Sequence, residues 1–172
     1  MALPVVHELE ELRVGVSELS DCVSCLLHSI LFTRSPGPVH PADAHCRFRP
    51  ITYAFVPEVK KQVDTAILQF QQRNMRRQTN QRSSGTITVV FYETRKKTAM
   101  FNFMATEDRI VFEKWIVPIR VLVHPPANPE EYCTQLESQL RHCMLHIIAT
   151  VQSETQHIPN VMYDYELVIN EF

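Results

Sequence analysis

Residues 110–123 read IVFEKWIVPIRVLV and form a long, largely apolar run. Large apolar side chains occupy alternate positions, which places them on one face of an extended strand. The members of this face are Trp115, Val117, Ile119, Val121 and Val123. Pro118 interrupts the run, and because proline has no N–H for a sheet ladder we expect a bulge or an edge position there. The run therefore predicts a long strand with one apolar face.

Three other segments have the composition of strands. Residues 86–92, TITVVFY, are β-branched or aromatic throughout, which is typical of a half-buried strand. Residues 51–56 are a shorter candidate, and residues 163–169, YDYELVI, are placed to form a closing strand. Residues 71–84 are rich in glutamine, asparagine and arginine, and we expect them to form a surface loop.

Three segments repeat apolar residues at i, i+4, i+7, i+8 and i+11, which is the spacing of one buried stripe along a helix. The stripes are Leu19, Val23, Leu26, Leu27 and Ile30; Val59, Val63, Ala66, Ile67 and Phe70; and Leu136, Leu140, Cys143, Met144 and Ile147, extended by Tyr132 and Val151. Asn128 is predicted as the N-cap of the third helix and Pro129 as its first residue. Pro57 similarly marks the start of the second helix, and Ser17 the start of the first.

The order of these elements predicts the fold class. Helices and strands are mixed without regular alternation, so we predict an α+β protein with a mostly antiparallel sheet. A length of 172 residues predicts one domain over residues 1–172, large enough to bury a core without disulfides.

Composition excludes several functions. A formal net charge of −2 argues against a general nucleic-acid binder, which needs a basic excess. The three glycines, Gly15, Gly37 and Gly85, lie far apart, which excludes a glycine-rich phosphate loop. The N-terminus lacks a signal pattern, no uninterrupted apolar run approaches the ~18 residues of a membrane span, and nothing suggests disulfides, so we expect a cytoplasmic protein.

Two spacings could carry metal or redox chemistry. Cys22 and Cys25 form a CxxC pair, but the pair lies inside a helical pattern and has no second pair, so we interpret both as core residues. His142 and His146 share a helix face, as two metal ligands would, but no third ligand can be named and we interpret them as surface residues. No convergent set of titratable residues emerges. We therefore predict no catalytic residues, no metal, no cofactor and no small-molecule substrate.

Two basic clusters flank the strand at 86–92: Arg73, Arg76, Arg77 and Arg82 before it, and Arg95, Lys96 and Lys97 after it. At ~3.3 Å per residue the strand holds them about 20 Å apart, so they form two sites. We interpret both as solvated loops, with contact to an anionic partner or membrane as the alternative. Residues 100–104, MFNFM, form either a short strand with buried aromatic rings or a loop that presents Phe101 and Phe103 to a partner.

Residues 22–35, CVSCLLHSILFTRS, resemble the first helix of HORMA-domain proteins, in particular the accessory subunits of the autophagy-initiation kinase complex. The Leu27–His28 pair and the Arg34–Ser35 ending carry this match. Further matches follow in order at residues 51–53, 90–92, 112–115 and 158–159. Together they cover most of residues 10–160, and the resemblance rests on their order and spacing.

The resemblance implies a HORMA fold, in which three helices pack on one side of a mostly antiparallel sheet. It implies an adaptor without enzymatic activity that forms a heterodimer with the HORMA domain of autophagy-related protein 13, stabilises it and helps recruit downstream factors. The location would be cytoplasmic, with recruitment to the phagophore assembly site and only indirect membrane contact. The third helix commonly forms the dimer surface of this fold, so Gln139, His142 and His146 are the expected partner-binding residues.

Two features depart from the wider pattern. These accessory subunits often carry a Trp-Pro-Phe loop that recruits later factors, whereas the comparable segment here offers Met100, Phe101, Phe103 and Met104. Alanine at Phe101 or Phe103 is expected to weaken recruitment without unfolding the chain. Only 21 residues follow Val151, so we expect no C-terminal belt that wraps a peptide. The alternatives are a peptide-binding checkpoint-type HORMA adaptor and a module that binds anionic lipid or nucleic acid through the basic loops.

Overall fold

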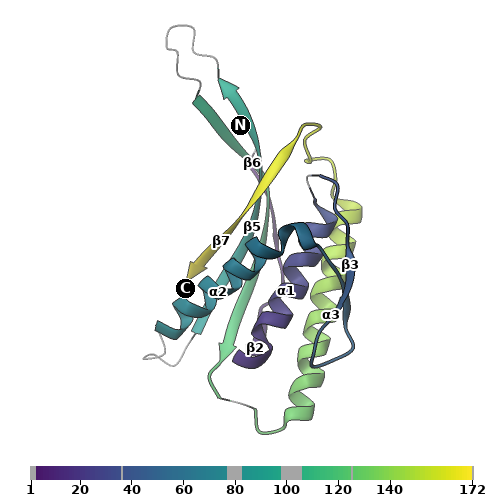
Figure 1. Ribbon diagram of the computed structural model, residues 1–172, viewed down its shortest axis with the longest axis vertical. Helices are drawn as coiled ribbons and strands as arrows, with labels where there is room; N and C mark the ends of the chain where they lie inside the picture. Colours follow the sequence, from purple (N-terminus) through teal and green to yellow (C-terminus); the bar gives the residue numbers. More distant parts are fainter. Residues whose placement is uncertain (1–2, 36, 77–82, 98–105, 125, 172) are drawn as a thin grey trace.

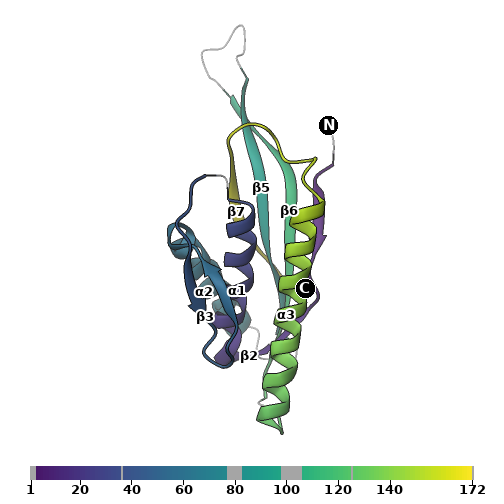
Figure 2. The same cartoon turned by 90° about the vertical axis from the view of Figure 1, so that its right-hand side faces the viewer.

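Two long paired strands organise the computed structural model, which describes residues 3–35, 37–76, 83–97, 106–124 and 126–171. Strand β5 (Ser83–Lys97) pairs antiparallel with β6 (Thr106–Leu122) along its whole length. Figures 1 and 2 show that one end of this pair, where β5 ends and β6 begins, extends beyond the helices. The predicted strands at 86–92 and 110–123 are therefore confirmed and are longer than their apolar cores.

Three shorter strands complete this sheet. Strands β1 (Val5–Glu8) and β2 (Leu12–Gly15) lie one after the other along β6 and run parallel to it. Strand β7 (Tyr163–Glu171) confirms the predicted closing strand at 163–169, and it pairs antiparallel with the other edge of β5. The strand order is β1-β6-β5-β7, with β2 also beside β6. The sheet is mixed but mostly antiparallel, and the α+β class is confirmed.

Pro118 lies in a central strand, so the predicted edge position is wrong. The partners of β1 in β6 end at Ile116 and those of β2 begin at Ile119, which leaves Pro118 opposite the break between the two short strands. The carbonyl of Ile116 accepts a hydrogen bond from Leu9 N at 3.0 Å. Backbone groups of residues two apart in a strand point toward the same neighbouring strand, so position 118 also points toward β1 and β2. Pro118 therefore lacks its N–H where no neighbouring strand needs it. The bulge lies elsewhere, between Phe91 and Tyr92.

Three helices gather on one side of the sheet (Figure 2). They are α1 (Val16–Thr33), α2 (Lys60–Arg76) and α3 (Pro129–Ser153), and a short 3₁₀ turn, η1 (Pro57–Val59), leads into α2. Helix α1 contacts both other helices and lies between them. The third helix begins as predicted, because the Asn128 side chain accepts a hydrogen bond from Glu131 N at 3.3 Å. Helix α1 begins one residue before Ser17, at Val16, with Gly15 as its N-cap.

The three apolar stripes form the core. Their members are buried except for Met144, Tyr132 and Val151, which are half-buried and pack against it. Trp115 is fully buried, whereas Val123 is 47% exposed because β6 ends at Leu122. Helix α1 is long and apolar enough to span a membrane by length and hydropathy, but half of it is buried inside the protein, as in a core helix.

Two local predictions need correction or extension. Helix α2 continues to Arg76 and β5 begins at Ser83, so the predicted loop over residues 71–84 is wrong for both of its ends. Glutamine, arginine and methionine are good helix formers, and this propensity extends the helix beyond its apolar stripe. The candidate strand at 51–56 is β4 (Thr52–Phe55), which pairs with the unpredicted β3 (Ala42–His45) in a separate two-stranded sheet.

A buried ion pair joins the end of α1 to the centre of β6. Arg34 Nε lies 3.2 Å from both carboxylate oxygens of Glu113, which is fully buried. The same guanidinium donates to the carbonyl oxygens of Val151 at 3.5 Å and Glu154 at 2.6 Å, at the end of α3. Carbonyls in the last turn of a helix have no partner within the helix, so Arg34 supplies one for α3 while it neutralises Glu113.

Replacing Leu140 by alanine tests the position of α3 on the core. Leu140 is fully buried, so we expect Leu140→Ala to lower the free energy of unfolding by about 2–5 kcal/mol through loss of burial and a residual cavity. Leu145 on the same helix is 66% exposed, and Leu145→Ala should change stability by no more than about 0.5 kcal/mol. Equilibrium urea unfolding measures both, and equal effects would contradict the assigned helix face.

His28 predicts a loss of stability in mild acid. Its Nδ1 accepts a hydrogen bond from Val56 N at 3.1 Å, and burial lowers the pKa of the ring from 6.5 to about 4. A depressed folded-state pKa gives stability that is complete above pH 6.5 and declines as pH falls toward 4, by up to roughly 3 kcal/mol. Unfolding measured across this range should show a smaller pH dependence in His28→Gln. An unchanged slope would contradict the assignment.

Candidate partner-binding surface

The predicted partner-binding residues lie on the side of α3 that faces β2 and the turn before it. Gln139 Oε1 accepts a hydrogen bond from Arg13 N in β2 at 2.9 Å. His142 is exposed, with Nε2 3.4 Å from a carboxylate oxygen of Glu10, and His146 is half-buried. Gln139 thus helps hold α3 to the sheet, while His142 is the most accessible of the three. Their role in binding stays a prediction.

The outward side of α3 also carries exposed apolar residues. Leu145 is 66% exposed and Ile148 is 46% exposed. At 100° per residue Leu145 lies about 140° from the buried Leu140, close to the direction opposite the core stripe. Arg141 borders this face and pairs with Glu137 at 2.9 Å. The sequence offered one signal for this surface: Leu145 and Ile148 are large aliphatic residues that lie outside the predicted core stripe.

An open groove lies between α3 and β2, along the first half of α3. Its lining is mostly polar and comes from both elements: Glu10, Glu11, Arg13, Leu122, Tyr132, Gln135, Ser138 and Gln139. The phenol of Tyr132 accepts from Gly15 N at 2.6 Å and donates to Glu18 at 3.0 Å, which fixes the ring between α3 and the start of α1. Helix α3 therefore has a polar side, which lines the groove, and an exposed apolar surface formed by Leu145 and Ile148, which we call the apolar crest.

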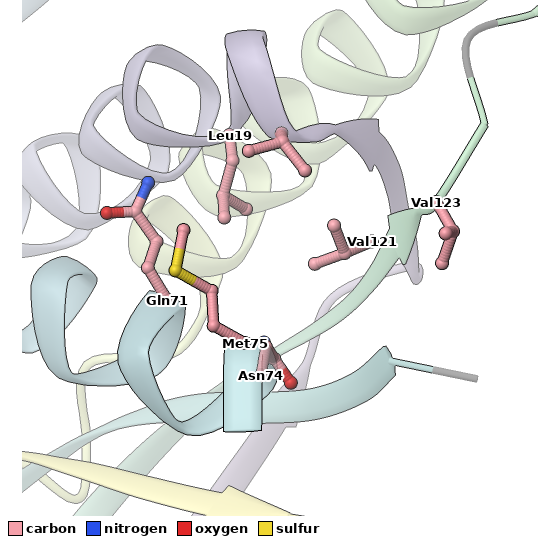
Figure 3. Close-up of a pocket in the computed structure, with 7 residues that line it drawn as sticks. Leu19, Gln71, Asn74, Met75, Val121 and Val123 are labelled. Atoms are coloured by element: carbon pink, nitrogen blue, oxygen red, sulfur yellow. The ribbon is translucent and has the colours of Figure 1, made fainter. Parts of the chain in front are cut away.

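A small apolar pocket lies between α1, α2 and β6 (Figure 3). The start of α1, the end of α2 and the end of β6 line it through Val16, Leu19, Gln71, Asn74, Met75, Val121 and Val123. Its volume is about 50 Å³, far below the roughly 300–1,000 Å³ of ligand sites for drug-sized molecules. Asn74 Nδ2 is buried beside it without a hydrogen-bond partner. The pocket can hold a water-sized group or one small side chain.

Cys22 and Cys25 are core residues, as predicted. Both are fully buried, and Cys25 Sγ lies 3.6 Å from Met144 Sδ in α3. Burial raises the pKa of the Cys22 thiol, and it raises that of Cys143 to about 11. These thiols therefore stay protonated at neutral pH and are poor nucleophiles.

Arg73 and Arg95, one from each basic cluster, lie toward different ends of β5. Arg73 donates to the carbonyl of Ile169, which pairs with Ile87, while Arg95 contacts Glu93 at 2.5 Å near the far end of the strand. These two arginines are engaged within the chain. The predicted recruiting segment, with Met100, Phe101, Phe103 and Met104, lies outside the described residues, and its role stays a prediction.

Comparisons with known proteins place this arrangement in a family context. A family model described as Autophagy-related protein 101 matches residues 11–164, from the start of β2 into β7. The protein of that name from Arabidopsis thaliana is 27% identical over 190 aligned positions, which cover 95% of this chain and 86% of that relative. The similarity therefore extends over all three described helices and both long strands.

Proposed function

The chain belongs to the Autophagy-related protein 101 family, and on this premise we propose that it is a non-catalytic adaptor subunit of the autophagy-initiation complex. It forms a heterodimer with the HORMA domain of autophagy-related protein 13, stabilises that domain and helps recruit downstream factors. Its place of action is the cytoplasm, at the phagophore assembly site. Two findings support the proposal: the chain belongs to this family, and α3 exposes the apolar crest.

The crest supports binding of another protein. Leu145 is 66% exposed and Ile148 46% exposed, and at 100° per residue they lie about 60° apart on the same side of α3. Interfaces gain most of their energy from a few apolar or aromatic anchors that a partner buries within a polar rim. His142 and Arg141 supply polar groups at the edge of this crest. The third helix is therefore our binding surface, with Leu145 and Ile148 added to the residues expected from the sequence.

The proposed HORMA identity agrees with the described architecture, which has three helices on one side of a mostly antiparallel sheet. Strand β7 is paired with β5 from Tyr163 to Glu171. Residues 163–171 thus extend the sheet of this chain, which supports the autophagy type over a checkpoint protein that uses such a segment to wrap a peptide. The engagement of Arg73 and Arg95 within the chain lowers the support for an anionic-lipid or nucleic-acid module.

Co-expression with the partner HORMA domain tests the proposal, with size-exclusion chromatography and light scattering as the readout. We expect a one-to-one complex for the wild-type chain. Leu145→Glu should prevent this complex, because a carboxylate in an apolar interface loses its hydration without gaining a partner. The melting temperature of the isolated chain should not change, since Leu145 contacts solvent.

Leu68→Glu is the matched control. Leu68 is 54% exposed on α2 and offers the same side chain on a different helix. This variant should bind the partner like the wild type. A wild-type chain that stays monomeric with the partner present would contradict the heterodimer, and equal loss of binding in both variants would contradict the assignment of the surface to α3.

A further inference from the structure

Two histidines converge on the buried carboxylate of β6. His7 Nε2 lies 3.0 Å from Glu113 Oε1, and His157 Nε2 lies 3.1 Å from the same oxygen. The three residues come from β1, β6 and the turn after α3, and their potential ligand atoms all lie within 4.8 Å of one another. His7 is 7% exposed and Glu113 is fully buried, while the side chain of His157 is 17% exposed.

His157 lacks the hydrogen bond that its position suggests. Its Nε2 is buried, and although a carboxylate oxygen of Glu113 lies 3.1 Å away, the two atoms are not oriented for a hydrogen bond. A buried polar nitrogen without a partner is unfavourable, because it has lost its water without replacement. A cation held between the two imidazole nitrogens and the carboxylate would satisfy all three groups together.

We propose that His7, Glu113 and His157 form a binding site for a divalent transition-metal ion, with Zn²⁺ as the best match. Two imidazoles and one carboxylate are a common zinc ligand set, which leaves a fourth position for water. Tetrahedral zinc with bonds of about 2.0–2.1 Å separates its ligand atoms by about 3.3 Å. The separations of 3.0 and 3.1 Å between each imidazole nitrogen and the carboxylate oxygen lie close to this value, and all three ligand atoms lie within 4.8 Å of one another.

The surroundings supply an outer shell for the ion. Glu154 Oε2 lies 3.9 Å from His7 Nδ1, on the side of the ring away from Glu113, so it can orient that imidazole. Trp115 covers His7 at a ring separation of 4.4 Å, and Phe112 lies 6.4 Å from the ring of His157. The partial exposure of His157 gives the ion a route from solvent.

Arg34 sets the strength of the site. Its guanidinium already neutralises Glu113, so zinc, Arg34, Glu113 and Glu154 together would carry a net charge of +1. We therefore expect weaker binding than at a site with the same ligands and no arginine. The bound ion would join β1 and β6 to the segment between α3 and β7, which is a structural role.

Titration of the chelator-treated full-length chain with Zn²⁺ tests the site. Isothermal titration calorimetry should give one ion per wild-type chain, and the melting temperature should rise by about 5–10 °C at zinc a hundredfold above Kd. His7→Gln and His157→Gln should each weaken binding at least about tenfold, since even outer-shell changes weaken metal binding by 10–100-fold. Failure of the wild type to bind zinc saturably would overturn the proposal.

His142→Gln is the control, because His142 and Glu10 form an exposed pair that could also attract zinc. This variant should bind like the wild type, and loss of binding here with retention in His157→Gln would overturn the assignment. Glu113→Gln is avoided, since it leaves Arg34 buried without its partner.

A Co²⁺-loaded wild-type chain needs no variant: intense visible bands of four-coordinate cobalt support the site, and a weak six-coordinate spectrum contradicts it.

Discussion

The buried pair of Arg34 and Glu113 constrains more of this fold than any other described contact. Glu113 lies in the middle of the central strand and is fully buried, so its carboxylate needs hydrogen-bond donors that other elements supply. Arg34 does this from the end of α1 and also binds the last carbonyls of α3, while its own carbonyl accepts from the Tyr163 hydroxyl at 3.3 Å. Removal of one partner from such a pair typically costs about 3–5 kcal/mol. The pair thus fixes two helices and the start of β7 relative to one point on the sheet.

This constraint also orders the face of α3 that we propose for binding. With both ends of α3 held, by Tyr132 near the start and Arg34 at the end, the helix presents the same outward face along its length. The buried stripe through Leu140 faces α1 and the sheet, and Leu145 and Ile148 are left to solvent. A rigid helix that already exposes apolar anchors loses little conformational freedom on binding, which favours a stable complex. The packing of α3 within the chain therefore supports the proposed adaptor role.

Local patterns in the sequence predicted the helices and the long strands well. Each apolar stripe had the period of a helix, and Asn128 and Pro129 marked the start of α3. Strands β1 and β2 were missed because each has four residues and gains its stability from pairing with β6. Pro118 was misplaced for the same reason: the break between those two strands depends on tertiary pairing. The convergence of His7 and His157 on Glu113 was also beyond sequence spacing, since more than 100 residues separate His7 from Glu113.

The apolar crest on α3 is the central feature of the functional account, and amide hydrogen–deuterium exchange measured with and without the partner HORMA domain tests it most directly. Side chains at the crest are exposed in the free chain, so binding there should slow exchange in peptides that cover residues 138–149, with little change in α2. Protection confined to α2 or to the β7 edge, with α3 unchanged, would contradict the account.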